Sequence, residues 1–372
     1  MELTNTDEQT RPAARVIGEG EARIWGMSAS ERLHRTFRRL GLDEAAASAG
    51  GLVAADARYV FDESLIKALA QHPGVVLVDE DGTPTAIHAQ GMAARRMAAG
   101  EAIAAVAAEH RAMTAHELGS AYNSELRKRE PPILRRLTAG DVRAVERRLF
   151  QGSYKGVTDL VTKYVWPAPA RVVTRWCALA RITPNQVTFA SFLLVLLAFG
   201  LFWTGHFGWG LAAAWGMTFL DTVDGKLARV TLTSSKWGNV FDHGIDLVHP
   251  PFWWWAWLVG VQASGHPVGA PTLILTVIFV GYIVQRMLEG AFLAAFKVEM
   301  HAWRPFDSFF RLITARRNPN LLLLTPAALL GRPDIGLILV AIWTALSLGV
   351  HVVQMIQGLL APKGQVASWL SN

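Results

Sequence analysis

The sequence contains very little cysteine and comparatively little charge. Cys177 is the single cysteine among 372 residues, which excludes a disulfide within the chain and the class of small secreted domains that disulfides stabilise. Charged residues make up 18% of the chain, whereas soluble proteins usually carry about a quarter. Hydrophobic residues reach 51%, which excludes disorder as the main state because there is ample apolar surface to bury.

The apolar residues are concentrated in the second half of the chain. Residues up to about 150 are Ala-rich and charged, whereas long apolar runs and most of the 14 tryptophans follow from Gln186 onward. This asymmetry indicates a soluble N-terminal domain joined to a membrane domain. The first ten residues, MELTNTDEQT, are polar and acidic, so we expect no signal peptide and a cytosolic N-terminal domain.

Short strands and capped helices alternate in the N-terminal part. Runs of β-forming residues at 75–78 and 85–88 flank an Asp-Gly turn, and a capping box at Ser28 begins a helix. An Ala-rich helix of about twenty residues is expected from Gly91. The pattern predicts a small α/β domain over residues 1–140.

Basic residues separate this domain from the apolar half. The net charge is +6, and many of the arginines lie between residues 127 and 148. Positive charge beside a membrane segment is typical of the cytosolic side of a bilayer, so we expect membrane lipids as partners and no nucleic acid. Basic and aromatic residues alternate over 141–185, which predicts a basic linker with an interfacial amphipathic helix, the alternative being a plain linker.

Six apolar segments follow over residues 186–362, with a C-terminal tail at 363–372. A bilayer-spanning helix needs roughly 20 apolar residues, so residues 321–330 are the shortest candidate and five spans are the alternative. Lysine and arginine concentrate in every second loop, which predicts six transmembrane helices with both ends in the cytosol. The predicted fold is therefore an all-α membrane bundle of six transmembrane helices, preceded by the cytosolic α/β domain, in the cytoplasmic (inner) membrane.

Four carboxylates interrupt these apolar segments, where each charge is costly. Asp221 and Asp224 are three residues apart at the end of the second segment, and Asp242 and Asp246 are four apart at the start of the third. Each pair therefore shares one helical face, and the short turn between the helices brings the pairs together. Such a cluster needs cations, and oxygen ligands without histidine or cysteine select Mg²⁺ or Mn²⁺.

Small residues lie on the same helical faces. Gly225 and Ala228 follow Asp221 by four and seven positions, and Gly238 lies one turn before the second pair, so both helices leave room for a bulky ligand. Arg229 can reach phosphate oxygens. Ion pairing of the aspartates with Arg229 and Lys236 at the membrane edge is the structural alternative, and a cation-binding transporter is the functional one. A transporter would place its acids near mid-membrane rather than at the cytosolic end.

Residues 221–246 follow the pattern DxxDGxxAR, eight residues, GxxxDxxxD, with every fixed position present. This motif resembles the CDP-alcohol phosphotransferase (CDP-alcohol phosphatidyltransferase) family, and the similarity covers roughly residues 150–362. The resemblance implies a six-helix membrane enzyme that moves a phosphoalcohol group from a CDP-alcohol to a hydroxyl acceptor and releases CMP. The donor expected from it is CDP-diacylglycerol, the acceptor is a small hydroxyl compound, and a homodimer is the expected assembly.

The resemblance also assigns roles to the motif residues. It makes Asp221, Asp224 and Asp242 ligands of two Mg²⁺ or Mn²⁺ ions, and it makes Asp246 both a ligand of the second ion and the general base. The remaining positions would surround the nucleotide: Gly225 and Ala228 line the cytidine site, Arg229 supports that region and Gly238 permits close approach.

In the N-terminal domain, residues 55–84 read ADARYVFDESLIKALAQHPGVVLVDEDGTP. An acidic strand end followed by a helix and a strand resembles the middle of a sugar-phosphate nucleotidyltransferase. The Gly-rich phosphate loop of such enzymes is represented here by Gly18-Glu-Gly20-Glu-Ala-Arg23, with acids where phosphate would lie. We therefore expect a degenerate, non-catalytic domain. The alternative is a bifunctional cytidylyltransferase and CDP-polyol phosphotransferase that makes and uses CDP-inositol or a similar donor.

Overall fold

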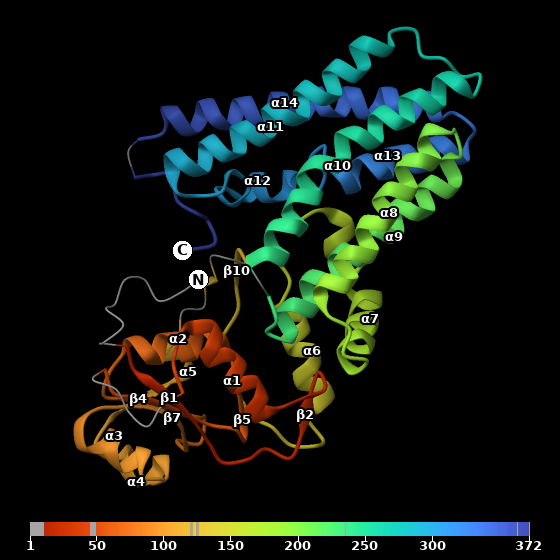
Figure 1. Ribbon diagram of the computed structural model, residues 1–372. Helices are drawn as coiled ribbons and strands as arrows, with labels where there is room; N and C mark the ends of the chain where they lie inside the picture. Colours follow the sequence, from red (N-terminus) through yellow and green to blue (C-terminus); the bar gives the residue numbers. More distant parts are fainter. Residues whose placement is uncertain are drawn as a thin grey trace. The chain divides into compact units, whose positions relative to one another are not determined.

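A computed structural model describes residues 11–44, 50–119, 122–123, 126–234, 236–362 and 364–371 (Figure 1). The side chains of residues 122, 236, 237, 239 and 241–243 lie outside this description. The chain divides into two compact units. The first comprises Met1–Asn123, Arg129–Ser153 and Arg229–Thr233, and the second comprises Ser124–Lys128, Tyr154–Ala228 and Ser234–Asn372.

A five-stranded sheet forms the centre of the first unit. The spatial order is β1 (Ala13–Ile17), β4 (Leu52–Asp56), β7 (Pro84–Ala89), β6 (Val75–Val78) and β8 (Arg111–Thr114). The outer pairs β1–β4 and β6–β8 are parallel, and the inner pairs are antiparallel. Three two-stranded sheets are β2 (Arg23–Ile24) with β3 (Met27–Ser28), β5 (Tyr59–Phe61) with β11 (Leu134–Arg136), and β9 (Tyr122–Asn123) with β10 (Lys128–Arg129).

The sheet and its helices confirm the predicted α/β domain. Helix α1 (Ala29–Leu40) begins where the Ser28 hydroxyl accepts the Glu31 amide at 3.0 Å, and it ends at Gly41 with φ +69°. The other helices of the unit are α2 (Glu63–Gln71), α3 (Gly91–Ala98), α4 (Ile103–Ala107), α5 (Ala115–Leu118) and α6 (Val142–Gly152).

The expected twenty-residue helix from Gly91 is wrong, because it is broken into α3 and α4. Gly100 adopts φ +104°, a left-handed conformation that ends a helix. The Arg96 side chain then holds Glu101 at 2.6 Å across the break. The two short helices pack Met97 and Ile103 into one buried cluster with strand residues such as Ile87.

Helices make up the second unit, and all six predicted apolar segments are helical. They are α8 (Pro184–Trp203), α9 (Phe207–Val230), α10 (Lys236–Ala263), α11 (Pro271–Phe296), α13 (Arg317–Leu329) and α14 (Pro333–Leu360). Within the described residues, α8, α11 and α14 are long and apolar enough to cross a membrane. Shorter elements are η2 (Val161–Val165), α7 (Pro167–Leu179), η3 (Met300–Ala302) and α12 (Pro305–Phe310).

Close helix contacts hold this unit together. Helices α11 and α14 run side by side, and α10 packs on α8 (Figure 1). A Cβ atom built on Gly260 would lie 2.0 Å from the Phe202 carbonyl oxygen, so only glycine allows α10 this close to α8. The indole of Trp253 donates to the Val195 carbonyl of α8 at 3.0 Å, and that of Trp257 donates to the Pro333 carbonyl at 3.0 Å. These buried tryptophans are core residues that join three helices.

Candidate functional site

Two of the predicted aspartates meet on one arginine that the motif does not contain. Asp221 lies on α9 and Asp246 on α10, and the Arg317 guanidinium at the start of α13 contacts both. One terminal nitrogen donates to Asp221 Oδ2 at 2.5 Å, and the other donates to Asp246 Oδ1. The contact brings together one acid of the second apolar segment and one acid of the third. It also brings a third helix to the cluster.

Asp224 attaches this cluster to α8. Its side chain is buried, and its Oδ2 accepts the Thr188 hydroxyl at 2.6 Å. Thr188 is the fifth residue of α8, which begins with a capping box between Thr183 and Gln186. The capped start of α8 therefore places the hydroxyl that orients a second carboxylate of α9.

The remaining motif residues lie on the same two helices. Gly225 and Ala228 are half-buried on α9, and Gly238 is half-buried on α10. The Asp242 side chain lies outside the described residues. The structural alternative paired the acids with Arg229 and Lys236. The Lys236 side chain lies outside the described residues, and the described ion-pair partner of Asp221 and Asp246 is Arg317.

The donor set of this cluster fits a hard divalent cation. Asp221, Asp224 and Asp246 offer carboxylate oxygens alone, which is the ligand type of Mg²⁺ and Mn²⁺. Asp221 and Asp246 share the Arg317 guanidinium. Their carboxylate oxygens are also the atoms that a divalent cation would use as ligands.

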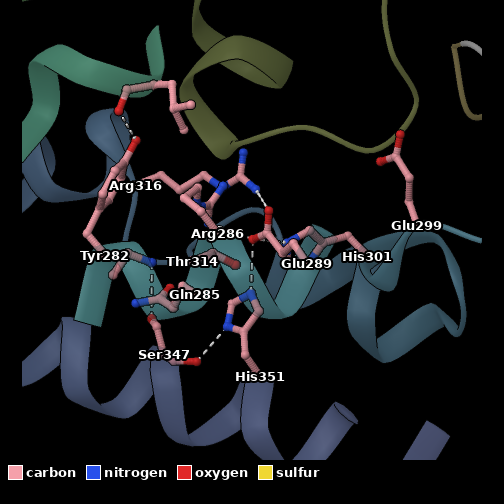
Figure 2. A network of polar contacts seen from close by, with 12 residues as sticks. Tyr282, Gln285, Arg286, Glu289, Glu299, His301, Thr314, Arg316, Ser347 and His351 are labelled. Carbon is pink, nitrogen blue, oxygen red and sulfur yellow. Dashed lines mark hydrogen bonds and ion pairs between the residues drawn. The ribbon is translucent and has the colours of Figure 1, made fainter. Parts of the chain in front are cut away.

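A second polar centre surrounds Glu289 on α11 (Figure 2). Arg286 donates to Glu289 Oε1 at 2.6 Å, and Arg316 donates to Oε2. The Nε2 atoms of His301 and His351 approach Oε1 at 3.1 Å and 3.2 Å. One carboxylate therefore holds two guanidinium groups and two imidazoles from four separate elements.

The histidines of this centre are held differently. His351 Nδ1 lies 2.7 Å from the Ser347 carbonyl, so it carries the ring proton there. Burial lowers the pKa of His301 to about 3, although the Glu289 carboxylate acts to raise it, so this ring is neutral at pH 7.

Glu289, His301 and His351 offer three potential metal ligands within 4.8 Å of one another. The surrounding charge argues against a divalent cation, because Arg286 and Arg316 already contact the carboxylate. Nε of each arginine is buried without a hydrogen-bond partner among the described residues. The centre is better suited to an anion, which could accept these N–H groups.

A third guanidinium reinforces this positive charge. Arg311 Nη1 is buried and has no hydrogen-bond partner in the described part of the chain. Burial lowers the pKa of Arg311, and the Asp159 carboxylate acts to raise it. Burial acts to raise the pKa of Asp159, but the Arg311 charge and hydrogen bonds from Thr162 and Asn318 hold it below its usual value. Three arginines thus face two carboxylates, Glu289 and Asp159.

The sequence analysis missed this centre and Arg317. In the sequence, Arg311, Arg316 and Arg317 are positive charges of a loop predicted to be cytosolic, and Glu289 is one acid in an apolar segment. The available signal was that acid itself, because a carboxylate in a membrane helix marks a functional position by default. Its partners come from η3, the start of α13 and α14, which the sequence does not connect.

Comparison with known proteins identifies the helical region. A family model described as CDP-alcohol phosphatidyltransferase matches residues 181–351. The chain is similar to a bifunctional IPC transferase and DIPP synthase of Rubrobacter xylanophilus, with 32% identity over 160 residues, 42% of this chain and 33% of the relative. It is also similar to a phosphatidylinositol phosphate synthase of Mycobacteroides abscessus, with 36% identity over 29% of this chain and 51% of the relative.

An archaetidylinositol phosphate synthase of Pyrococcus horikoshii is 39% identical over 79 residues, 21% of this chain and 42% of the relative. The matches thus span between a third and a half of each relative's length. The family match encloses the complete aspartate motif and the arginine that joins two of its acids. Residues 181–351, in the helical region of this chain, thus match the CDP-alcohol phosphatidyltransferase family.

Proposed function

We propose that the chain is an integral membrane transferase that moves a phosphoalcohol group from a CDP-alcohol to a hydroxyl acceptor, with release of CMP. The observation that carries the proposal is the complete motif of residues 221–246, with Asp221 and Asp246 brought onto one guanidinium. We take CDP-diacylglycerol as the donor and phospholipid biosynthesis as the process. The family match supports the reaction class.

The aspartates would hold two divalent ions, with Asp221, Asp224 and Asp242 as ligands and Asp246 near the second ion. When bound, Mg²⁺ or Mn²⁺ neutralises the diphosphate and the leaving CMP. Asp246 takes the proton of the acceptor hydroxyl while the oxygen of that hydroxyl bonds to the phosphorus and the bond from the phosphorus to CMP breaks. Gly225, Ala228 and Gly238 leave space for the nucleotide, and Arg229 supports that region.

We further propose that the acceptor carries a phosphate group, bound at the centre around Glu289. The unsatisfied N–H groups of Arg286, Arg311 and Arg316 support this, because guanidinium groups recognise phosphate oxygens. The Arg316-Arg317 dipeptide reaches both centres, which supports their belonging to one reaction site. Two of the relatives are named as synthases of inositol phosphate lipids, so inositol phosphate is the first acceptor to try.

All six apolar helices would span the inner membrane, with the aspartates at its cytosolic face. Helices α9 and α10 are long enough, at 24 and 28 residues. Helix α13 has 13 residues, about 20 Å at 1.5 Å per residue, so it would cross only part of the apolar layer unless its flanks extend it. The exposed Trp176 and Val172 of α7 support an interfacial position for that helix. A homodimer is part of the proposal and is tested by the mass of the purified protein.

The N-terminal domain would be non-catalytic. A Cβ on Gly20 would lie 2.6 Å from the Ala57 carbonyl oxygen, so the loop packs on the protein's own backbone. Glu19 and Glu21 are exposed where phosphate would lie, and Arg23 donates to the nearby Gly26 carbonyl at 3.2 Å. These contacts support the view that the loop does not cradle phosphate. They therefore favour a non-catalytic domain over a bifunctional enzyme.

The experiment is a CMP-release assay on the purified chain in detergent. CDP-diacylglycerol and Mg²⁺ are supplied with inositol phosphate, inositol or glycerol phosphate. We expect CMP release with a phosphorylated acceptor, loss of activity in EDTA and recovery with Mg²⁺ or Mn²⁺. Activity that survives thorough chelation, or a preference for unphosphorylated inositol, would contradict the metal or the acceptor assignment respectively.

A further inference from the structure

Arg317 occupies an unusual position for a positive charge beside proposed metal ligands. Its side chain is 13% exposed, and its two terminal nitrogens contact carboxylates on two different helices. Its third nitrogen, Nε, is buried with no hydrogen-bond partner in the described ranges. The guanidinium is therefore only partly satisfied by Asp221 and Asp246.

A guanidinium in this position competes with a divalent cation in two ways. It binds oxygen atoms of Asp221 and Asp246 that a metal would use, and it repels the metal through its own charge. Both effects lower the affinity of the site for metal. The competition for oxygen atoms and the repulsion would both weaken if the guanidinium moved to another anion, and the affinity for metal would then rise.

The donor supplies such an anion. Under the proposed function, a CDP-alcohol brings a diphosphate to the aspartate cluster. The planar guanidinium presents parallel N–H groups that match phosphate oxygens, and its unpartnered Nε–H adds another donor. We propose that Arg317 shares the aspartates with the metal, holding metal affinity down before the donor arrives, and then binds the donor diphosphate. This couples metal retention to donor binding.

The inference predicts effects of opposite sign in the Arg317→Gln variant. Mn²⁺ affinity of the full chain, measured by electron paramagnetic resonance without donor, should rise about tenfold or more, because one positive charge within a few ångströms of the site is removed. Affinity for CDP-diacylglycerol, measured by calorimetry at saturating Mn²⁺, should fall about tenfold, because a charge-assisted contact is lost. A residue that only supports the fold would weaken both affinities.

Arg332→Gln is the control, because it also removes one guanidinium, but from an exposed arginine that pairs with Asp334. Its Mn²⁺ affinity should stay within twofold of the parent chain. Arg317→Lys serves if the glutamine variant does not fold: it keeps the charge, so Mn²⁺ affinity should stay near that of the parent while donor affinity falls. Unchanged or weaker Mn²⁺ binding in a folded Arg317→Gln chain overturns the inference, as does unchanged donor affinity in either variant. The Mn²⁺ measurement needs no turnover, so a failure of the transferase proposal is distinguishable from a failure of this one.

Discussion

Replacing Asp246 by asparagine separates proton transfer from ligand binding. Asparagine keeps the size of the side chain and one ligand oxygen but cannot accept the proton of the acceptor hydroxyl. The Asp246 side chain is 40% exposed, whereas that of Asp221 is 16% exposed, so Asp246 is the more accessible of the two to an acceptor. Arg317 would keep Asp221 as its partner in this variant.

The expected loss is that of a general base. Such a loss lowers turnover on the order of 10²–10⁴-fold. At 1.36 kcal/mol for each factor of ten, this is about 2.7–5.4 kcal/mol of transition-state stabilisation. Donor affinity should change much less, whereas Asp221→Asn should weaken both metal and donor binding.

The assay pairs CMP release at saturating substrates with calorimetric titration of CDP-diacylglycerol in Mg²⁺. Asp221→Asn is the control for the loss of a buried ligand, and thermal unfolding checks that both variants are folded. If Asp246→Asn loses binding as fully as Asp221→Asn, Asp246 is an ordinary ligand and the base lies elsewhere. Near-normal turnover would refute the mechanism for this chain.

Three further predictions follow from other parts of the structure. Arg286→Gln should raise KM for inositol phosphate roughly 10–100-fold, because one charge-assisted hydrogen bond is lost, and kcat should change little. Arg332→Gln is the control: Arg332 is exposed and pairs with Asp334, so its replacement should change neither constant. The full chain with CTP and inositol phosphate should form no CDP-inositol by chromatography, and its detection would make the protein bifunctional. Gly260→Ala should cost about 1–3 kcal/mol of stability through overpacking against the Phe202 carbonyl. The loss should be seen as a lower Tm in a thermal scan that follows the reaction of the buried Cys177 thiol with a fluorescent maleimide. Gly290→Ala is the control and should not lower Tm, because there is open space around Gly290.

The local features of the chain could be predicted from the sequence because they depend on neighbouring residues. The Ser28 cap, the 75–78 strand and the helical spacing of Asp221 and Asp224 all follow from contacts a few positions apart. The broken helix at Gly100 was missed, because a run of alanines outweighed one glycine whose left-handed conformation is visible only in the structure.

The polar centres could be predicted only in part, since they depend on helices far apart in the sequence. The motif spacing placed acids of two helices together, but not the arginine 71 positions beyond Asp246 that joins them. His351 reaches Glu289 across 62 positions because α11 packs against α14, and Gly281 allows this contact by leaving room for Thr344. Hydropathy describes each helix singly and contains no information on such pairings.

The indole of Trp257 has a consequence for the order in which the helical unit is assembled. Its partner, the Pro333 carbonyl, lies 76 positions later, so the ribosome delivers α10 well before the start of α14. Trp253 has no such delay, because Val195 is made first. During synthesis α10 can therefore dock on α8 while the Trp257 N–H still lacks its acceptor. A nascent chain that stops before residue 333 would leave that donor unpaired, and synthesis of the start of α14 would supply the acceptor.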